Sequence, residues 1–142
     1  MTEGYSVSTI RRRQRKTRFT ISTPDDIYRL MTPILNGADR EHFYVILLTT
    51  KNAVISVELV SVGSLSANLV HPREVFKPAL IASAACVVAV HNHPSGDPGP
   101  SKEDIEFTKR LRRAGDILGV KVLDHVILGN GDYCSLEAEG QL

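Results

Sequence analysis

The sequence lacks the features of a membrane protein and of a disulfide-stabilised one. It contains no tryptophan and only two cysteines, Cys86 and Cys134, which lie far apart. No apolar run approaches the roughly eighteen residues of a membrane-spanning helix, and the N-terminus has no apolar signal-peptide core. We therefore expect a cytoplasmic protein without a membrane partner. Both cysteines fall in predicted strands, so we expect reduced, buried thiols with no part in catalysis or metal binding.

Net charge is also low, at +1, but the charges are unevenly distributed. Residues 1–20 carry six basic side chains and a single acid, whereas residues 21–142 carry 11 basic and 15 acidic side chains. This predicts a flexible basic arm over residues 1–20 and a single α/β domain over residues 21–142. Such a run is most often a solvated tail. Binding of a nucleic-acid backbone through Arg11–Arg18 stays open as the alternative.

Hydrophobic periodicity and turn residues predict the order helix, strand, strand, helix, strand, helix, strand, strand. The first helix should begin after an N-cap at Thr23, with Pro24 in its first position. The expected ranges are residues 24–35, 41–48, 53–60, 72 to about 85, 86–90, 102–118, 122–128 and 133–136, with an irregular connection over residues 62–68. This order of elements is typical of an α/β domain.

The stretch HNHPSGDPGPSKED, residues 91–104, lies between a buried strand and a helix. Alternate residues of an extended chain point to one side, and Pro94 keeps His93 extended, so His91 and His93 can direct both imidazoles to one point. Ser101 is a good N-cap for the following helix, which places Asp104 in its first turn. Two imidazoles and a carboxylate are the three protein ligands of a zinc site that keeps an open position. The alternative is a pair of structural histidines beside an ordinary capping box.

The spacing H-x-H, seven residues, S-x-x-D resembles the zinc signature of the JAMM (MPN+) metalloprotease family. The segment HNHPSGDPGPS, with LDHVIL downstream, resembles the RadC-type bacterial branch of that family. The likeness extends over roughly residues 23–140. The resemblance implies a three-layer fold akin to cytidine deaminases, with a mixed sheet between helices. It also implies Zn²⁺ held by His91, His93 and Asp104, and hydrolysis of peptide or isopeptide amide bonds in a protein or peptide substrate.

Two further roles come from the same resemblance. Glu41 precedes an apolar strand, approximately as in the family pattern E-F-x-x-L-L, and is expected to act as general base. Ser101 is expected to stabilise the oxyanion, although capping of the helix explains the same residue equally well. The dipeptide Asp124-His125 is either a pair that orients a metal ligand or a buried, satisfied histidine with its neighbour. His42 and His71 are expected to have no metal role.

Three alternatives to a peptidase fit the sequence less well. The absence of both H-x-E and P-C-x-x-C argues against a deaminase. A non-catalytic scaffold has no need of Glu41, His91, His93, Ser101 and Asp104 together. The DNA-repair label of the RadC-type branch fits only the basic arm. The oligomeric state is not readable from the sequence, although an exposed sheet edge could pair in a dimer.

Overall fold

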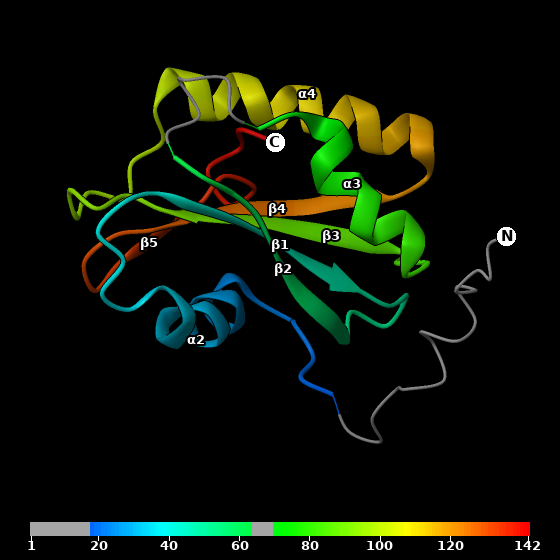
Figure 1. Ribbon diagram of the computed structural model, residues 1–142, viewed down its shortest axis with the longest axis horizontal. Helices are drawn as coiled ribbons and strands as arrows, with labels where there is room; N and C mark the ends of the chain where they lie inside the picture. The colour runs from blue at the N-terminus through cyan, green and yellow to red at the C-terminus, as the bar shows by residue number, and fades with distance from the viewer. Residues whose placement is uncertain (1–17, 64–69) are drawn as a thin grey trace, which may run out of the picture.

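The computed structural model describes residues 18–63 and 70–142, and its elements follow the predicted order (Figure 1). They are α2 (Pro24–Leu35), β1 (His42–Leu48), β2 (Val54–Val62), α3 (Pro72–Ile81), β3 (Cys86–Asn92), α4 (Lys102–Leu118), β4 (Lys121–Leu128) and β5 (Tyr133–Ser135). Among the described helices, none combines the length and apolarity needed to cross a membrane.

Three predicted boundaries are wrong by two residues or more, and four others differ by one residue. α3 ends at Ile81 rather than near residue 85, because Ser83 adopts a left-handed conformation, with φ 55°, that ends the helix. β2 continues to Val62, which pairs with His42 of β1, so its last residue lies in the expected connection. β3 continues past residue 90 to Asn92 because it stays paired with β4 over its whole length.

The five strands form one mixed sheet in the order β2-β1-β3-β4-β5. β1 pairs antiparallel with β2 and β3, and β4 pairs antiparallel with β5. β3 and β4 are parallel, and α4 makes the crossover between them. The predicted mixed sheet is confirmed, and its parallel pair places the end of β3 next to the end of β4.

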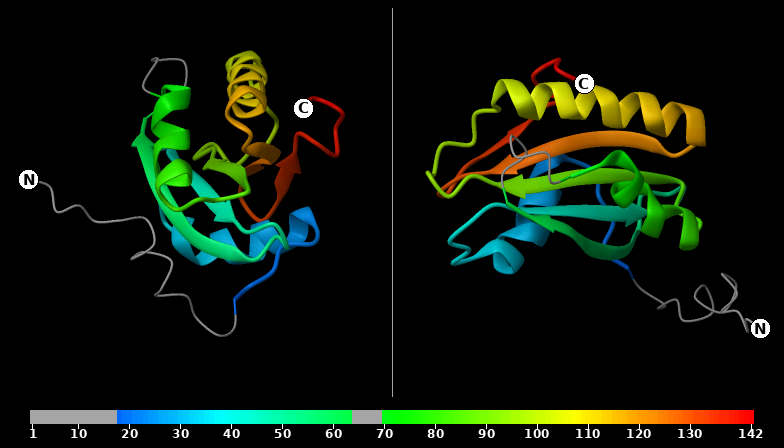
Figure 2. Two further views of the ribbon diagram at one scale, coloured as in Figure 1. Left: turned by 90° about the vertical axis from the view of Figure 1, so that its right-hand side faces the viewer. Right: turned by 45° about the horizontal axis from the view of Figure 1, so that its top comes forward.

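Helices cover both faces of the sheet, which gives three layers. α3 and α4 lie on one face and α2 lies on the other, as the views of Figures 1 and 2 show together. Alternate residues of β3 therefore enter different cores: Val87 and Ala89 pack under α3 and α4, whereas Val88 and Val90 pack with α2. Every residue of β3 is buried, as expected for a strand covered on both faces.

Segment 18–21 belongs to the folded body. Thr20 forms an isolated antiparallel bridge with Ala53, and Ile21 is buried in the α2 core. The rest of the predicted basic arm, residues 1–17, lies outside the described residues, as do residues 64–69 of the predicted connection.

The two cysteines differ in their burial. Cys86 is buried on the α2 side of β3, away from His91, as the strand parity predicts. Cys134 is only partly buried, so the prediction of full burial is wrong for this residue. Neither forms a disulfide, and burial raises the pKa of both thiols. Neither thiol is therefore poised to react.

Candidate metal centre

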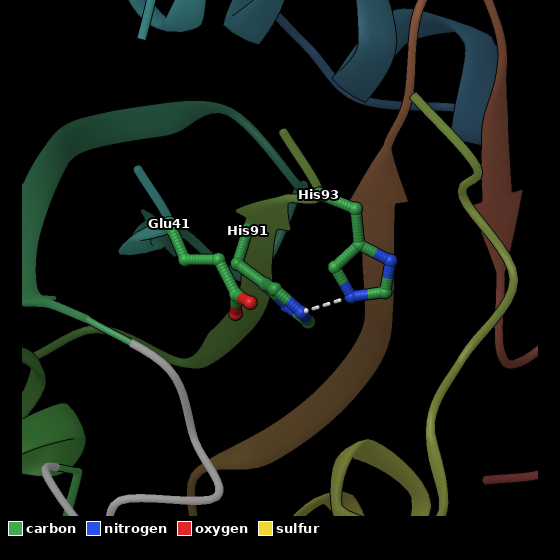
Figure 3. A group of neighbouring side chains, drawn as sticks. All are labelled: Glu41, His91 and His93. Carbon is green, nitrogen blue, oxygen red and sulfur yellow. Dashed lines mark hydrogen bonds between the residues drawn. The ribbon is translucent and has the colours of Figure 1, made fainter. Parts of the chain in front are cut away.

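Four side chains from three segments converge at one end of the sheet, on the side of α3 and α4. Glu41 immediately precedes β1, His91 lies near the end of β3 with His93 just after that strand, and Asp104 lies in the first turn of α4. The two imidazole Nε2 atoms are 3.1 Å apart, and the Asp104 carboxylate oxygens lie 3.3 Å from His91 Nε2 and 3.2 Å from His93 Nε2. Ligand atoms of Glu41, His91 and His93 all lie within 4.8 Å of one another (Figure 3).

The spacing of these donor atoms fits a metal ion. Zinc bonds of about 2.0–2.1 Å in a tetrahedral arrangement separate neighbouring ligand atoms by about 1.6 times that length, near 3.3 Å. The observed separations among His91, His93 and Asp104 are 3.1–3.3 Å. Two imidazoles with one or two carboxylates also form a donor set that zinc accepts. Glu41, His91 and His93 therefore form a group that could hold a metal ion, and Asp104 lies within ligand distance of both histidines.

Local contacts give His93 the form that a metal ligand needs. Its Nδ1 lies 2.9 Å from the backbone oxygen of Asp97. Because a carbonyl can only accept, Nδ1 carries the hydrogen and Nε2 faces the Asp104 carboxylate. A lone pair and a carboxylate at this distance require a cation between them, either a proton or a metal ion.

The electrostatics of Asp104 reflect this demand. Burial raises the pKa of its carboxyl, but the contacts with the His91 and His93 imidazoles outweigh burial and hold the pKa well below its usual range. Conversely, the hydrogen bond to Asp104 raises the pKa of His93 against the effect of burial. The carboxylate thus stays ionised at neutral pH and attracts whichever cation occupies the centre.

Ser101 caps α4. Its hydroxyl accepts a hydrogen bond from the Asp104 N–H at 3.0 Å, and the Asp104 carboxylate accepts one from the Ser101 N–H at 2.8 Å. This reciprocal pair is a capping box, so that explanation of Ser101 is confirmed. The hydroxyl keeps its own hydrogen for donation, because capping uses only an oxygen lone pair. Its expected role toward an oxyanion therefore stays a prediction.

Asn92, which no sequence motif singled out, fixes the backbone around Glu41. Its side-chain oxygen accepts a hydrogen bond from the His42 N–H at 2.7 Å, and its amide nitrogen donates to the Arg40 carbonyl at 3.1 Å. The Glu41 carbonyl accepts from the Gly63 N–H at 2.9 Å. The signal was present in the sequence: a buried amide at the end of an apolar strand needs partners.

The dipeptide Asp124-His125 divides into two roles. His125 is fully buried, and its Nε2 lies 2.8 Å from Nδ1 of His91. Asp124 points elsewhere, accepting hydrogen bonds from the Ser135 hydroxyl at 2.6 Å and from backbone N–H groups. Burial lowers the pKa of His125 well below its ordinary value, so its imidazole is neutral. His125 therefore contacts a candidate ligand, and Asp124 joins β4 to β5.

The remaining histidines stay outside the centre. His42 Nδ1 lies 2.9 Å from the Arg40 carbonyl oxygen, and His71 caps α3 by accepting from the Arg73 N–H at 3.1 Å. Arg73 and Glu74 form an exposed ion pair at that helix start, with 3.6 Å between charged atoms. Neither histidine is placed to bind the metal with His91 and His93.

Comparisons with known proteins show the relatives of this chain. A family model described as a RadC-like JAB domain matches residues 21–141. The chain is 52% identical over 122 residues to a UPF0758 protein of Caldanaerobacter subterraneus and 52% identical over 133 residues to one of Shouchella clausii, covering 86% and 92% of this chain. A UPF0758 protein of Methanosarcina mazei is 53% identical over 120 residues, or 84% of the chain.

These matches cover 52%, 58% and 52% of the three relatives, so the chain spans about half the length of the curated relatives it matches. The family match begins at Ile21 and ends at Gln141, so it spans the sheet, the described helices and the positions of all four converging side chains. The resemblance to the RadC-type branch is confirmed: the chain belongs to the RadC-like JAB domain family.

Proposed function

We propose that this domain is a zinc-dependent peptidase that hydrolyses peptide or isopeptide amide bonds. The supporting observation is the convergence of two imidazoles and a carboxylate at the spacing of zinc ligands, with a second carboxylate within 4.8 Å of the imidazoles. His91, His93 and Asp104 would hold the ion, which leaves a position open on the side of Glu41. The three-layer arrangement also agrees with the implied likeness to cytidine deaminases, which we retain as part of this proposal.

The two carboxylates suit different tasks. Zinc supplies a Lewis acid and, at neutral pH, a nucleophilic water. Asp104 is committed as a ligand because its oxygens already face two imidazoles and the Ser101 N–H. Glu41 has no ion-pair partner in the parts of the chain that the structure describes, and its carboxylate is only partly buried. Glu41 would therefore accept the proton of the attacking water and deliver it to the leaving amine.

Ser101 would complete the site. It follows the loop after His93 and is exposed at the start of α4. Its hydroxyl hydrogen is not needed for capping and would be donated to the oxyanion that forms on the substrate carbonyl. A metal ion that activates water, a general base and an oxyanion donor are the parts that metal-assisted amide hydrolysis requires.

The proposal is tested by metal content together with hydrolysis. Purified protein, supplied with zinc, is analysed for metal and incubated with a peptide library that includes lysine-branched isopeptides, with new termini read by mass spectrometry. We expect about one zinc per chain and cleavage in the wild type, and neither in His91→Ala or Asp104→Ala. Glu41→Gln should keep zinc and lose about 10²- to 10⁴-fold in rate.

Glu58→Gln is the matched control, because this β2 carboxylate lies outside the centre and its loss should change neither readout. Full activity in Glu41→Gln would contradict the assignment of the base. Absence of zinc from the wild type would contradict the enzyme itself. Nucleic-acid binding through Arg11–Arg18 and a non-catalytic scaffold stay predictions, since among the described residues only Arg18 belongs to that basic run.

A further inference from the structure

A continuous line of buried hydrogen bonds leads from the backbone of α4 to His91. The Thr108 hydroxyl lies 2.7 Å from the backbone oxygen of Asp104 and 2.6 Å from His125 Nδ1. The other nitrogen of His125 lies 2.8 Å from His91 Nδ1. Thr108 and His125 are 0% exposed and His91 is 1% exposed, so water does not substitute for any member.

Donor and acceptor capacities fix the direction of this line. The Asp104 carbonyl can only accept, so the single hydroxyl hydrogen of Thr108 points to it. The Thr108 oxygen must then accept from His125, which places the hydrogen of that neutral imidazole on Nδ1 and leaves Nε2 as an acceptor. His125 Nε2 in turn accepts from His91 Nδ1. His91 is therefore left with a bare Nε2.

That bare nitrogen is the atom that faces the candidate metal centre. His91 Nε2 lies 3.3 Å from Asp104 Oδ1 and 3.1 Å from His93 Nε2. The hydrogen bond made by one ring nitrogen decides which nitrogen is free to bind a metal. His93 obtains the same result directly, from the Asp97 carbonyl beside it. His91 is buried inside the sheet and needs two intermediate side chains to reach a carbonyl.

Aromatic packing holds both imidazoles of the line in place. The Phe43 ring stacks on His91, with centroids 5.8 Å apart and planes 16° from parallel. The same ring meets His125 at 5.6 Å and 65°. One buried phenylalanine thus limits rotation of both histidines, so the hydrogen bonds cannot exchange partners without disturbing the core.

We propose that Thr108 and His125 are positioning residues that fix His91 in its Nδ1–H tautomer and so present its Nε2 to a divalent metal ion. The inference rests on the metal centre proposed above. It adds that two of the candidate ligands, Asp104 and His91, are linked twice. The backbone carbonyl of one ligand, Asp104, sets the tautomer of another, His91, whose free nitrogen returns to the Asp104 carboxylate. Helix α4 thereby controls both ligands.

The first measurement is the tautomer of His125 by ¹⁵N NMR of the imidazole nitrogens in the full chain, with and without zinc. His125 is not a ligand, so its tautomer reports the direction of the line in both states. We expect hydrogen on Nδ1 and a bare Nε2. Hydrogen on Nε2 would overturn the proposal, and this result needs no substitution that could impair folding.

The second measurement is zinc affinity by competition with a chromophoric chelator. Thr108→Val removes the hydroxyl and should weaken zinc binding by about 10- to 100-fold, whereas Thr108→Ser restores the hydroxyl and should stay within about threefold of the wild type. Thr32→Val is the control, because Thr32 makes the same hydroxyl-to-carbonyl bond within α2, away from the centre. Equal zinc affinity of Thr108→Val and the wild type would overturn the positioning role of Thr108 and His125. Neither readout depends on hydrolysis, so a domain that binds zinc as expected and cleaves nothing would contradict only the proposed function.

Discussion

At the level of single residues, hydrogen bonds outside the candidate metal centre hold its donors in position, two of them directly to backbone groups. The Asp97 carbonyl holds the His93 ring, and the Ser101 N–H holds the Asp104 carboxylate. Asn92 holds the chain on both sides of Glu41. The donors are therefore arranged before an ion arrives, which reduces the ordering that binding requires.

Asn92→Ala should separate the position of Glu41 from metal binding. The change leaves the His42 N–H and the Arg40 carbonyl without their partner, so we expect a loss of about 1–3 kcal/mol in the free energy of unfolding. Hydrolysis should fall because Glu41 is no longer held, whereas zinc content should remain, because His91, His93 and Asp104 keep their contacts. Denaturant unfolding, elemental analysis and peptide hydrolysis measure the three effects.

Asn130→Ala, at an exposed turn, serves as the control for loss of an asparagine side chain and should change none of the three. If Asn92→Ala lost zinc together with hydrolysis, Glu41 would belong among the metal ligands rather than beside them.

How far single residues can be predicted depends on whether their partners are local. The convergence of His91, His93 and Asp104 could be predicted from the sequence, because strand alternation and the first turn of a helix are local geometry. Thr108 and the contact of His125 with His91 depend on the register of β3 against β4, in which His125 pairs with Ala89. One sequence does not reveal that register, because several alignments of two apolar strands bury equal surface.

At the level of elements, α4 lies unusually close to the chain entering β4. A Cβ added at Gly115 would collide with the Val120 carbonyl oxygen and lie 3.2 Å from both Phe76 and Val122. Glycine is needed there because the backbones meet, although it weakens the helix. This contact fixes α4 against the sheet and, through its other end, the position of Asp104.

Gly115→Ala should therefore destabilise the protein, although alanine is the better helix former. In an open helical position the change would add about 1 kcal/mol of stability. Here we expect a net loss of about 1–3 kcal/mol, because the helix must move away from Val120. The free energy of unfolding from denaturant titration measures it.

Gly119→Ala is the comparison that measures backbone strain without a steric clash, because Gly119 has a φ of 75° but nothing within 4 Å of an added Cβ. It should cost about 1 kcal/mol from left-handed strain alone. A Gly115→Ala protein as stable as the wild type would show that α4 can move away from β4 at no cost.

Elements were predictable where the chain itself ends them. Thr23 and Pro24 begin α2 as expected, and Gly119 ends α4 in a left-handed conformation. The end of α3 was not predictable, because the residues that follow Ile81 include good helix formers and no glycine or proline. There the turn at Ser83 is imposed by the entry into β3 rather than by local preference.

At the level of the whole molecule, the donors of the metal centre come together only when the sheet and α4 have assembled. Residues 41, 91, 93 and 104 span almost half of the chain. Binding therefore belongs to the folded state, and a ligand of the folded state alone raises its stability. Three features at this scale stay predictions: the cytoplasmic location, the protein or peptide partner, and a dimer through an exposed sheet edge.

Zinc should raise the melting temperature of the metal-free protein in a concentration-dependent way. At a free concentration of 100 times Kd the gain is about 2.7 kcal/mol. Asp104→Ala should show no such gain at the same concentrations, and thermal unfolding followed by circular dichroism measures both. An equal gain in the variant would place the ion elsewhere.

The stabilisation by zinc should increase as the pH rises. The raised pKa of His93 stabilises the metal-free fold fully below the ordinary value near 6.5, and that contribution is lost as pH rises through the raised value. Zinc requires the unprotonated imidazole, so its advantage over the proton increases across the same interval. A gain that shrinks with rising pH would contradict histidine ligation.

The double covering of β3 has a consequence for how this domain can vary. Its side chains alternate between two cores, and His91 and Asn92 continue that alternation into the centre and behind it. Inserting or deleting one residue between Cys86 and Val90 would turn every later side chain over, exchanging the imidazole with the amide. Substitutions in this strand change packing by degrees, whereas a change of length removes the chemistry at once. Natural variation should therefore change the amino acids of β3 while preserving the number of residues in the strand.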